Sequence, residues 1–225
     1  MGEHITLQAE DGHELDAYVA RPEGTPIAGL VVVQEAFGVN SHIRFVADGY
    51  AKDGFLVVAP ALYDRIQRGV ELGYSDEDMG KGITLARQGK PENWVKDVAA
   101  ALAFAHQETG KKAGVIGYCL GGTVAWLSAT RLKPDAVVGY YGGNILACAA
   151  EHPRAPVMLH FGKEDQHIPK EKIDSVFMAA HPNIPVYWYD AGHGFNCNDR
   201  ASYNSEAARQ ARERSLEFLK KHLTA

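Results

Sequence analysis

The chain has 225 residues, of which 46% are hydrophobic and 23% are charged, and its formal net charge is −5. This length suits one large domain, and the hydrophobic content excludes a chain that is disordered throughout. The excess of acidic residues argues against a nucleic acid or an acidic membrane surface as partner, because both bind basic faces.

Cellular location and redox state are also indicated by the sequence. No apolar run approaches the ~20 residues of a membrane span, and the N-terminus lacks the basic and apolar regions of a signal peptide. The three cysteines, Cys119, Cys148 and Cys197, are an odd number spread along the chain, which argues against a disulfide framework and a zinc cluster. We therefore expect a cytoplasmic protein with reduced thiols, either a monomer or a small homo-oligomer.

The N-terminal segments 5–8 and 15–20 alternate between apolar and polar residues on either side of an Asp-Gly pair. This pattern predicts an antiparallel hairpin at a sheet edge. Continuous apolar runs follow and are typical of strands buried on both faces of a parallel sheet. These runs are 29–33, 55–59, 113–117, 136–140, 156–160 and 185–189.

Segments with helical periodicity alternate with these strands. They are 42–52, 92–108, 120–130, 170–180 and 206–222. The alternation predicts a single α/β domain over residues 1–225, with a mostly parallel twisted sheet and helices on both faces. Residues 63–91 break the rhythm without any strand pattern, so we expect a cap-like insertion there.

The segment Gly117-Tyr118-Cys119-Leu120-Gly121 directly follows a predicted strand and precedes a predicted helix. This is the nucleophile-elbow pattern, with cysteine in the nucleophile position and glycines where side chains would collide. The dipole at the helix N-terminus favours the Cys119 thiolate. The alternative is a small buried cysteine beside glycines that merely end the strand.

An elbow nucleophile requires an acid and then a histidine further along the chain. Asp165 follows the strand 156–160, and His193, flanked by glycines, follows the strand 185–189. In this arrangement His193 is the base, and Asp165 orients the imidazole and stabilises its charged form. Glu164 is the alternative to Asp165.

The strand 29–33 runs into the segment Gln34–Asn40, which occupies the position that supplies one oxyanion-hole amide in such folds. We expect the second donor from the elbow, so the pair is the backbone N–H groups of Ala36 and Leu120. Glu35 then points close to Cys119. The alternative for Glu35 is a solvated loop carboxylate.

Four stretches together resemble the dienelactone hydrolase family of the α/β-hydrolase superfold. They are Gln34–Asn40, the cysteine elbow, Gly162–Pro169 and Ala191–Phe195. The resemblance covers nearly the whole chain, and the four motifs occur in the family's order.

The resemblance implies a triad of Cys119, His193 and Asp165 that hydrolyses an activated ester or lactone through a thioester acyl-enzyme. It also implies that Glu35 contacts the resting thiol and takes its proton when substrate displaces it. The substrate is a small molecule, and the chemistry needs no metal or organic cofactor.

In the family, two arginines grip a substrate carboxylate, one within the insertion and one four residues after the catalytic histidine. This chain has Cys197 at the second position, and Lys81 is the nearest cation at the first. Arg65 and Arg200 lie near the two positions and are substitutes or surface charges. The aromatic residues expected to wall the pocket are Phe37, Tyr63 and Phe195.

Other functions compete with the lactone hydrolase. A promiscuous carboxylesterase or thioesterase would use the same triad without a dienelactone preference. A thiol-redox protein would use Cys119, but the chain has no Cys-x-x-Cys motif. A non-catalytic ligand-binding relative is disfavoured because every triad position is chemically competent.

Overall fold

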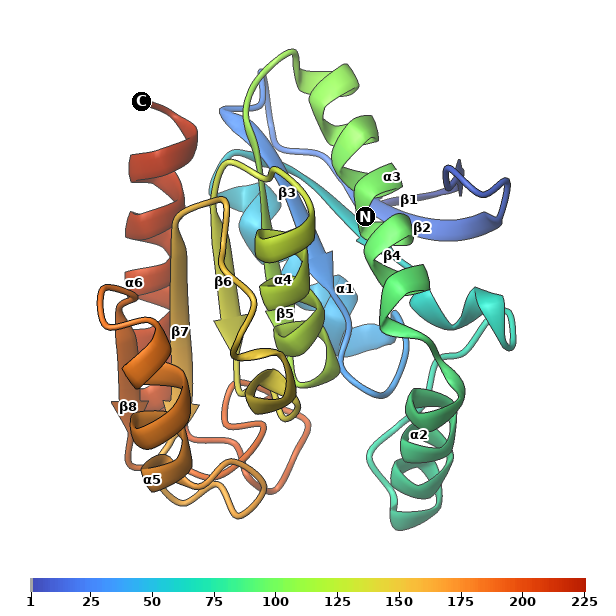
Figure 1. Cartoon of the computed structure of the whole chain (residues 1–225). Helices are drawn as coiled ribbons and strands as arrows, with labels where there is room; N and C mark the ends of the chain where they lie inside the picture. Colours follow the sequence, from blue (N-terminus) through green and yellow to red (C-terminus); the bar gives the residue numbers. More distant parts are fainter. Residues whose placement is uncertain (1) are drawn as a thin grey trace.

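The computed structural model describes residues 2–225, which form one eight-stranded sheet with helices on both faces (Figure 1). The strand order is β1-β2-β4-β3-β5-β6-β7-β8. The strands are β1 (Glu3–Gln8), β2 (Glu14–Ala20), β3 (Ala28–Val33), β4 (Phe55–Pro60), β5 (Ala113–Tyr118), β6 (Val137–Tyr140), β7 (Val157–Gly162) and β8 (Val186–Tyr189).

The strand pairing confirms the predicted hairpin and the mostly parallel sheet. β1 pairs antiparallel with β2, with Leu7 opposite Leu15, and β2 is antiparallel to β4. All other neighbouring strands are parallel. Every residue of β3, β4 and β5 is buried, as expected for strands covered on both faces.

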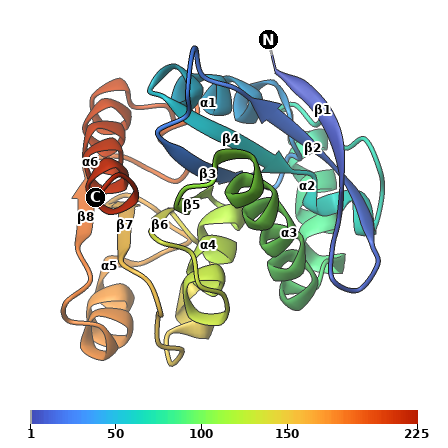
Figure 2. The ribbon, with the colours of Figure 1, turned by 90° about the horizontal axis from the view of Figure 1, so that it is seen from above.

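Helices α1 and α6 cover one face of the sheet, and α3 and α4 cover the other (Figure 2). The α-helices are α1 (Ser41–Lys52), α2 (Asp76–Gln88), α3 (Pro91–Thr109), α4 (Leu120–Arg131), α5 (Lys170–Lys172) and α6 (Ser205–Leu223). Two short 3₁₀ segments, η1 (Leu62–Arg65) and η2 (Ile145–Cys148), and one π-helical segment, η3 (Ile173–Met178), complete the structure. None of the helices formed by residues 2–225 has the length and apolar character of a membrane span.

Four of the five predicted helices agree with the structure to within about one residue at each end, and the segment 170–180 differs. It is a single α-helical turn, α5, followed by the wider turns of η3. Ile173 and Phe177 are the buried residues of η3, so the apolar spacing that predicted a helix does mark its core-facing side.

The predicted insertion, residues 63–91, contains most of η1 and all of α2, a helix that its polar composition did not reveal. Ser75 caps α2 by accepting a hydrogen bond from the Asp78 amide, and only Gly82 and Leu85 are buried. The Tyr63 hydroxyl lies 3.2 Å from the Ala36 carbonyl oxygen and 3.3 Å from that of Gly82. The insertion thus docks onto the loop that follows β3.

Three glycines allow α4 to start directly at the end of β5. A Cβ atom on Gly117 would lie 1.9 Å from the Gly121 carbonyl oxygen. One on Gly121 would lie 2.4 Å from the Val33 oxygen, and one on Gly122 would lie 2.3 Å from the Tyr140 oxygen. These contacts are all with backbone, which cannot move aside as a flexible side chain would.

We expect Gly117→Ala to lower the free energy of unfolding by about 2–4 kcal/mol, because the added methyl group overpacks a backbone contact. Gly80→Ala is the matched control, since a Cβ at Gly80 on α2 meets nothing within 4 Å. That substitution should add up to about 1 kcal/mol through helix propensity. Denaturant unfolding measures both changes, and equal stability of the two variants would contradict the packing argument.

Candidate active site

Cys119 occupies a strained turn between β5 and α4. Its backbone has φ 54° and ψ −114°, a conformation that non-glycine residues rarely adopt. The Cys119 amide donates to the carbonyl oxygen of Tyr140 on the neighbouring strand at 3.0 Å. The cysteine therefore sits at the carboxyl edge of the sheet and immediately before the first residue of α4, as the elbow pattern predicts.

His193 and Asp165 lie next to Cys119, although each comes from a different loop. His193 Nε2 is 3.2 Å from Cys119 Sγ, and His193 Nδ1 is 2.7 Å from Asp165 Oδ2. The other Asp165 oxygen, Oδ1, accepts a hydrogen bond from the His167 amide at 2.9 Å. Glu164 is exposed, whereas Asp165 is buried, so the structure selects Asp165 from the two candidate acids.

Hydrogen bonds within the triad shift the pKa values of His193 and Asp165 in opposite directions. Burial by itself lowers the pKa of His193, but hydrogen bonds to Asp165 and Cys119 outweigh it and raise the pKa to about 10. Burial raises the pKa of Asp165, yet the hydrogen bond from His193 and its charge bring that pKa below its ordinary value. The imidazole is thus suited to hold the proton that the thiol gives up.

The two expected oxyanion-hole amides lie on adjoining segments. The Gly121 amide donates to the Gln34 carbonyl oxygen at 3.0 Å, which holds the loop after β3 against the elbow. Within residues 2–225, neither the Ala36 amide nor the Leu120 amide has a hydrogen-bond acceptor. Both N–H groups are therefore free to donate, and Leu120 directly follows Cys119.

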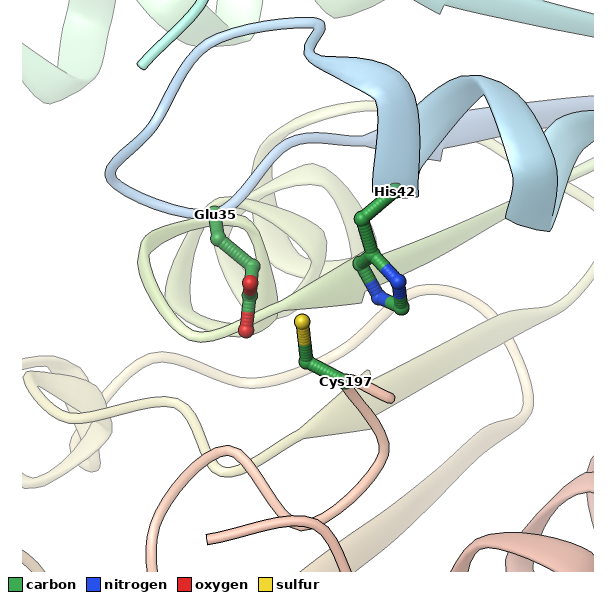
Figure 3. A group of neighbouring side chains, drawn as sticks. All are labelled: Glu35, His42 and Cys197. Atoms are coloured by element: carbon green, nitrogen blue, oxygen red, sulfur yellow. The ribbon is translucent and has the colours of Figure 1, made fainter. Parts of the chain in front are cut away.

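Glu35 is buried, and its carboxylate has no hydrogen bond to the Cys119 thiol among residues 2–225. The carboxylate is fully buried, so a solvated loop acid is wrong. Among residues 2–225 it also makes no hydrogen bond to Cys119, whose sulfur lies next to His193 instead. The Glu35 carboxylate lies beside His42 and Cys197, with the three ligand atoms within 4.8 Å of one another (Figure 3).

The two cations expected within the insertion are engaged elsewhere. Arg65 forms ion pairs with the fully buried Asp97 at 2.8 Å and with Asp11 at 3.0 Å. Lys81 pairs with Glu77, one turn earlier on α2, at 2.7 Å. The expectation that Arg65 replaces a substrate-binding arginine is therefore corrected, because both sides of its guanidinium are occupied by carboxylates.

Arg200 does lie at the site. Its Nη1 is 3.7 Å from Glu35 Oε1, and its guanidinium stands over the Phe37 ring at 5.6 Å. The same guanidinium packs against Gly194, the residue after His193. Arg200 is thus the expected cation that the fold brings to the triad.

The three aromatic residues expected to wall the pocket are all buried. Phe37 is buried within the loop that carries Ala36, and the buried Tyr63 holds that loop through a hydrogen bond from its hydroxyl to the Ala36 carbonyl oxygen. Phe195 is fully buried and packs on Tyr140 and Tyr141, so its ring is part of the packing behind the site.

Tyr141 and His42 were not anticipated. The Tyr141 ring lies 5.1 Å from that of His193, its φ is 37°, and its hydroxyl is buried without a hydrogen-bond partner among residues 2–225. Its position directly after an apolar strand could have marked it, since ligands bind at strand carboxyl ends. No local pattern marks His42, which lies at the start of α1.

The chain matches the dienelactone hydrolase family model over residues 15–223. Carboxymethylenebutenolidases from Pseudomonas putida and Pseudomonas knackmussii are each 34% identical to it over 225 residues, covering 96% of this chain and 95% of theirs. A crystal structure from Klebsiella pneumoniae, assigned to the dienelactone hydrolases, superimposes with a TM-score of 0.82 at 27% identity and covers 97% of this chain and 99% of that one. The chain therefore belongs to the dienelactone hydrolase family and is a hydrolase of ester bonds.

Proposed function

We propose that this hydrolase opens lactones and cleaves activated esters through a thioester formed on Cys119. The observation that carries the proposal is the hydrogen-bonded series from Cys119 Sγ through His193 to Asp165, at 3.2 and 2.7 Å. A thiol, an imidazole and a carboxylate in this order can activate a nucleophile and return its proton to a leaving group. The names of the carboxymethylenebutenolidase relatives support the lactone as substrate class.

In the acylation half-reaction, His193 holds the proton of Cys119 while the thiolate attacks the ester carbonyl carbon. The carbonyl oxygen becomes an oxyanion, which accepts hydrogen bonds from the Ala36 and Leu120 amides. Each such donor is worth about 3–4 kcal/mol in the transition state. The carbon–oxygen ester bond then breaks, and His193 passes its proton to the leaving oxygen. In a lactone that oxygen stays attached to the acyl chain.

In deacylation, His193 accepts a proton from water, and the resulting hydroxide attacks the thioester carbon. The same two amides hold the second oxyanion. Collapse releases the carboxylic acid and the Cys119 thiolate, which recovers its pairing with the protonated His193. The Asp165 carboxylate stabilises the imidazolium in both half-reactions without taking its proton.

We expect Cys119→Ala to abolish esterase activity toward an aryl ester while leaving the folded structure intact, because no other thiol occupies an elbow. Iodoacetamide should inactivate the unmodified protein, and substrate should protect it. Cys148→Ala is the matched control and should keep its activity, since Cys148 lies in η2 and takes no part in the hydrogen bonds that join Cys119, His193 and Asp165. Full activity of Cys119→Ala would contradict the proposal.

Glu35 is the alternative acceptor of the thiol proton. In that route His193 already carries a proton, which it passes to the leaving oxygen, and Glu35 returns the thiol proton to Cys119 after deacylation. Because Cys119 is hydrogen-bonded to His193 in the structure, this role requires the cysteine side chain to turn toward Glu35. We expect Glu35→Gln to slow acylation in single-turnover experiments and to leave deacylation unchanged, since His193 alone serves the second step. Unchanged acylation would leave His193 as the sole proton acceptor.

Specificity for a carboxylated substrate should be weak. Arg65 and Lys81 are paired with carboxylates, and Glu35 faces Arg200, so no matched pair of free arginines supports a carboxylate clamp. We expect kcat/KM for a carboxylated lactone and for its methyl ester to differ by about tenfold or less, roughly the value of one charge-assisted contact. This favours a broad carboxylesterase as the second candidate function. A ratio above about a thousand that collapses in Arg200→Ala would contradict it.

We also propose a cytoplasmic location and a monomer or small homo-oligomer. The three free cysteines support a reducing compartment.

A further inference from the structure

We propose that Glu35, His42 and Cys197 form a binding site for a divalent transition-metal ion of the zinc class, and that the Cys119 nucleophile is not one of its ligands. The three residues come from three segments: the loop after β3, the start of α1 and the loop after His193. Their ligand atoms lie within 4.8 Å of one another, and all three residues are buried (Figure 3). An ion there would join these segments by direct coordination.

The cluster contains polar atoms that the rest of the protein leaves unsatisfied. In residues 2–225, neither Glu35 oxygen has a hydrogen-bond partner, and nor does His42 Nε2. Glu35 is 0% exposed and His42 is 2% exposed, so bulk water does not satisfy these atoms. Leaving a buried polar group unpaired is costly, and a coordinated cation removes this cost for both residues together.

The hydrogen bond between His42 Nδ1 and Asn198 leaves the other ring nitrogen of His42, Nε2, free to bind a metal ion. Asn198 Nδ2 donates to Asp199 Oδ1 at 3.1 Å, which turns the amide oxygen of Asn198 toward His42. That oxygen lies 3.1 Å from His42 Nδ1, so Nδ1 carries the proton and donates it. Nε2 is then the bare acceptor nitrogen, and histidine ligands are commonly oriented through the other nitrogen in this way.

The ligand types identify the class of ion. A thiolate, an imidazole and a carboxylate are the ligands of zinc and its neighbours, whereas calcium and magnesium prefer sets made of oxygen alone. Binding would release the Cys197 thiol proton to solvent, and water would complete a tetrahedral shell. Arg200 Nη1 is 3.7 Å from Glu35 Oε1, so it partly balances the carboxylate charge without hydrogen-bonding to it.

The His42 side of the cluster borders a surface cavity. A surface cavity of about 480 Å³ is lined by His42, Asn198 and the exposed Phe45, among others.

Cobalt(II) titration of the full-length, reduced, chelator-treated protein tests the proposal, because thiolate coordination produces a charge-transfer absorption. We expect one equivalent of cobalt to bind with this absorption and zinc to displace it. The melting temperature should rise with zinc concentration, since the ion binds the folded state. Absence of the thiolate absorption in the unmodified protein would overturn the proposal.

Variants assign the ligands. Cys197→Ser should abolish the charge-transfer absorption, whereas Cys148→Ser, the matched control, should keep it. Cys119→Ala should also keep it, and its loss there would overturn the proposal by assigning the ion to the triad. Asn198→Ala changes an outer hydrogen bond at the surface and should weaken cobalt binding about 10–100-fold. If Cys197→Ser fails to fold, unchanged affinity in Asn198→Ala overturns the proposed role of His42.

Discussion

The positive φ of Cys119, held at 54° at the end of β5, is the constraint on which the rest of the site depends. It turns the chain from a buried strand into a helix without an intervening loop, so the sulfur and the Leu120 amide lie at the same edge of the sheet. The turn fits because Gly117 and Gly121 have no side chains to meet the nearby backbone. The cost of this strain, of order 1–3 kcal/mol, is balanced by the packing of the sheet and helices around it.

Two buried carboxylates near this turn are stabilised to different degrees. Asp165 accepts hydrogen bonds from His193 and from the His167 amide, so its charge is compensated at close range. Glu35 has only Arg200 at 3.7 Å and no hydrogen bond within the described chain. A buried polar group without a hydrogen bond lowers stability, and such groups concentrate where a protein uses them. Glu35 is therefore the residue of the two whose role in proton transfer and in metal binding the proposed experiments test.

The sequence by itself determined the sheet, the hairpin and the order of the triad residues. These features follow from local physical rules. Apolar runs of strand length require burial on both faces, and an Asp-Gly turn favours a hairpin. A nucleophile flanked by glycines marks a turn that tolerates no side chains. Cys119, Asp165 and His193 each follow a strand of the parallel sheet, so their convergence at one edge is a consequence of topology that can be read from the chain.

The tertiary structure alone decided which charged groups meet. Asp165 and Glu164 are adjacent in sequence, but only the loop conformation buries one and exposes the other. Arg65 looked available for substrate until the fold placed Asp97 and Asp11 around it. The sequence pattern did not predict that Glu35 lies beside Cys197. The two residues are on loops far apart along the chain, and the backbone turns of those loops bring them together. Composition and periodicity do not specify the backbone paths of these loops. Those paths decide which charged side chains meet and which stay unpaired.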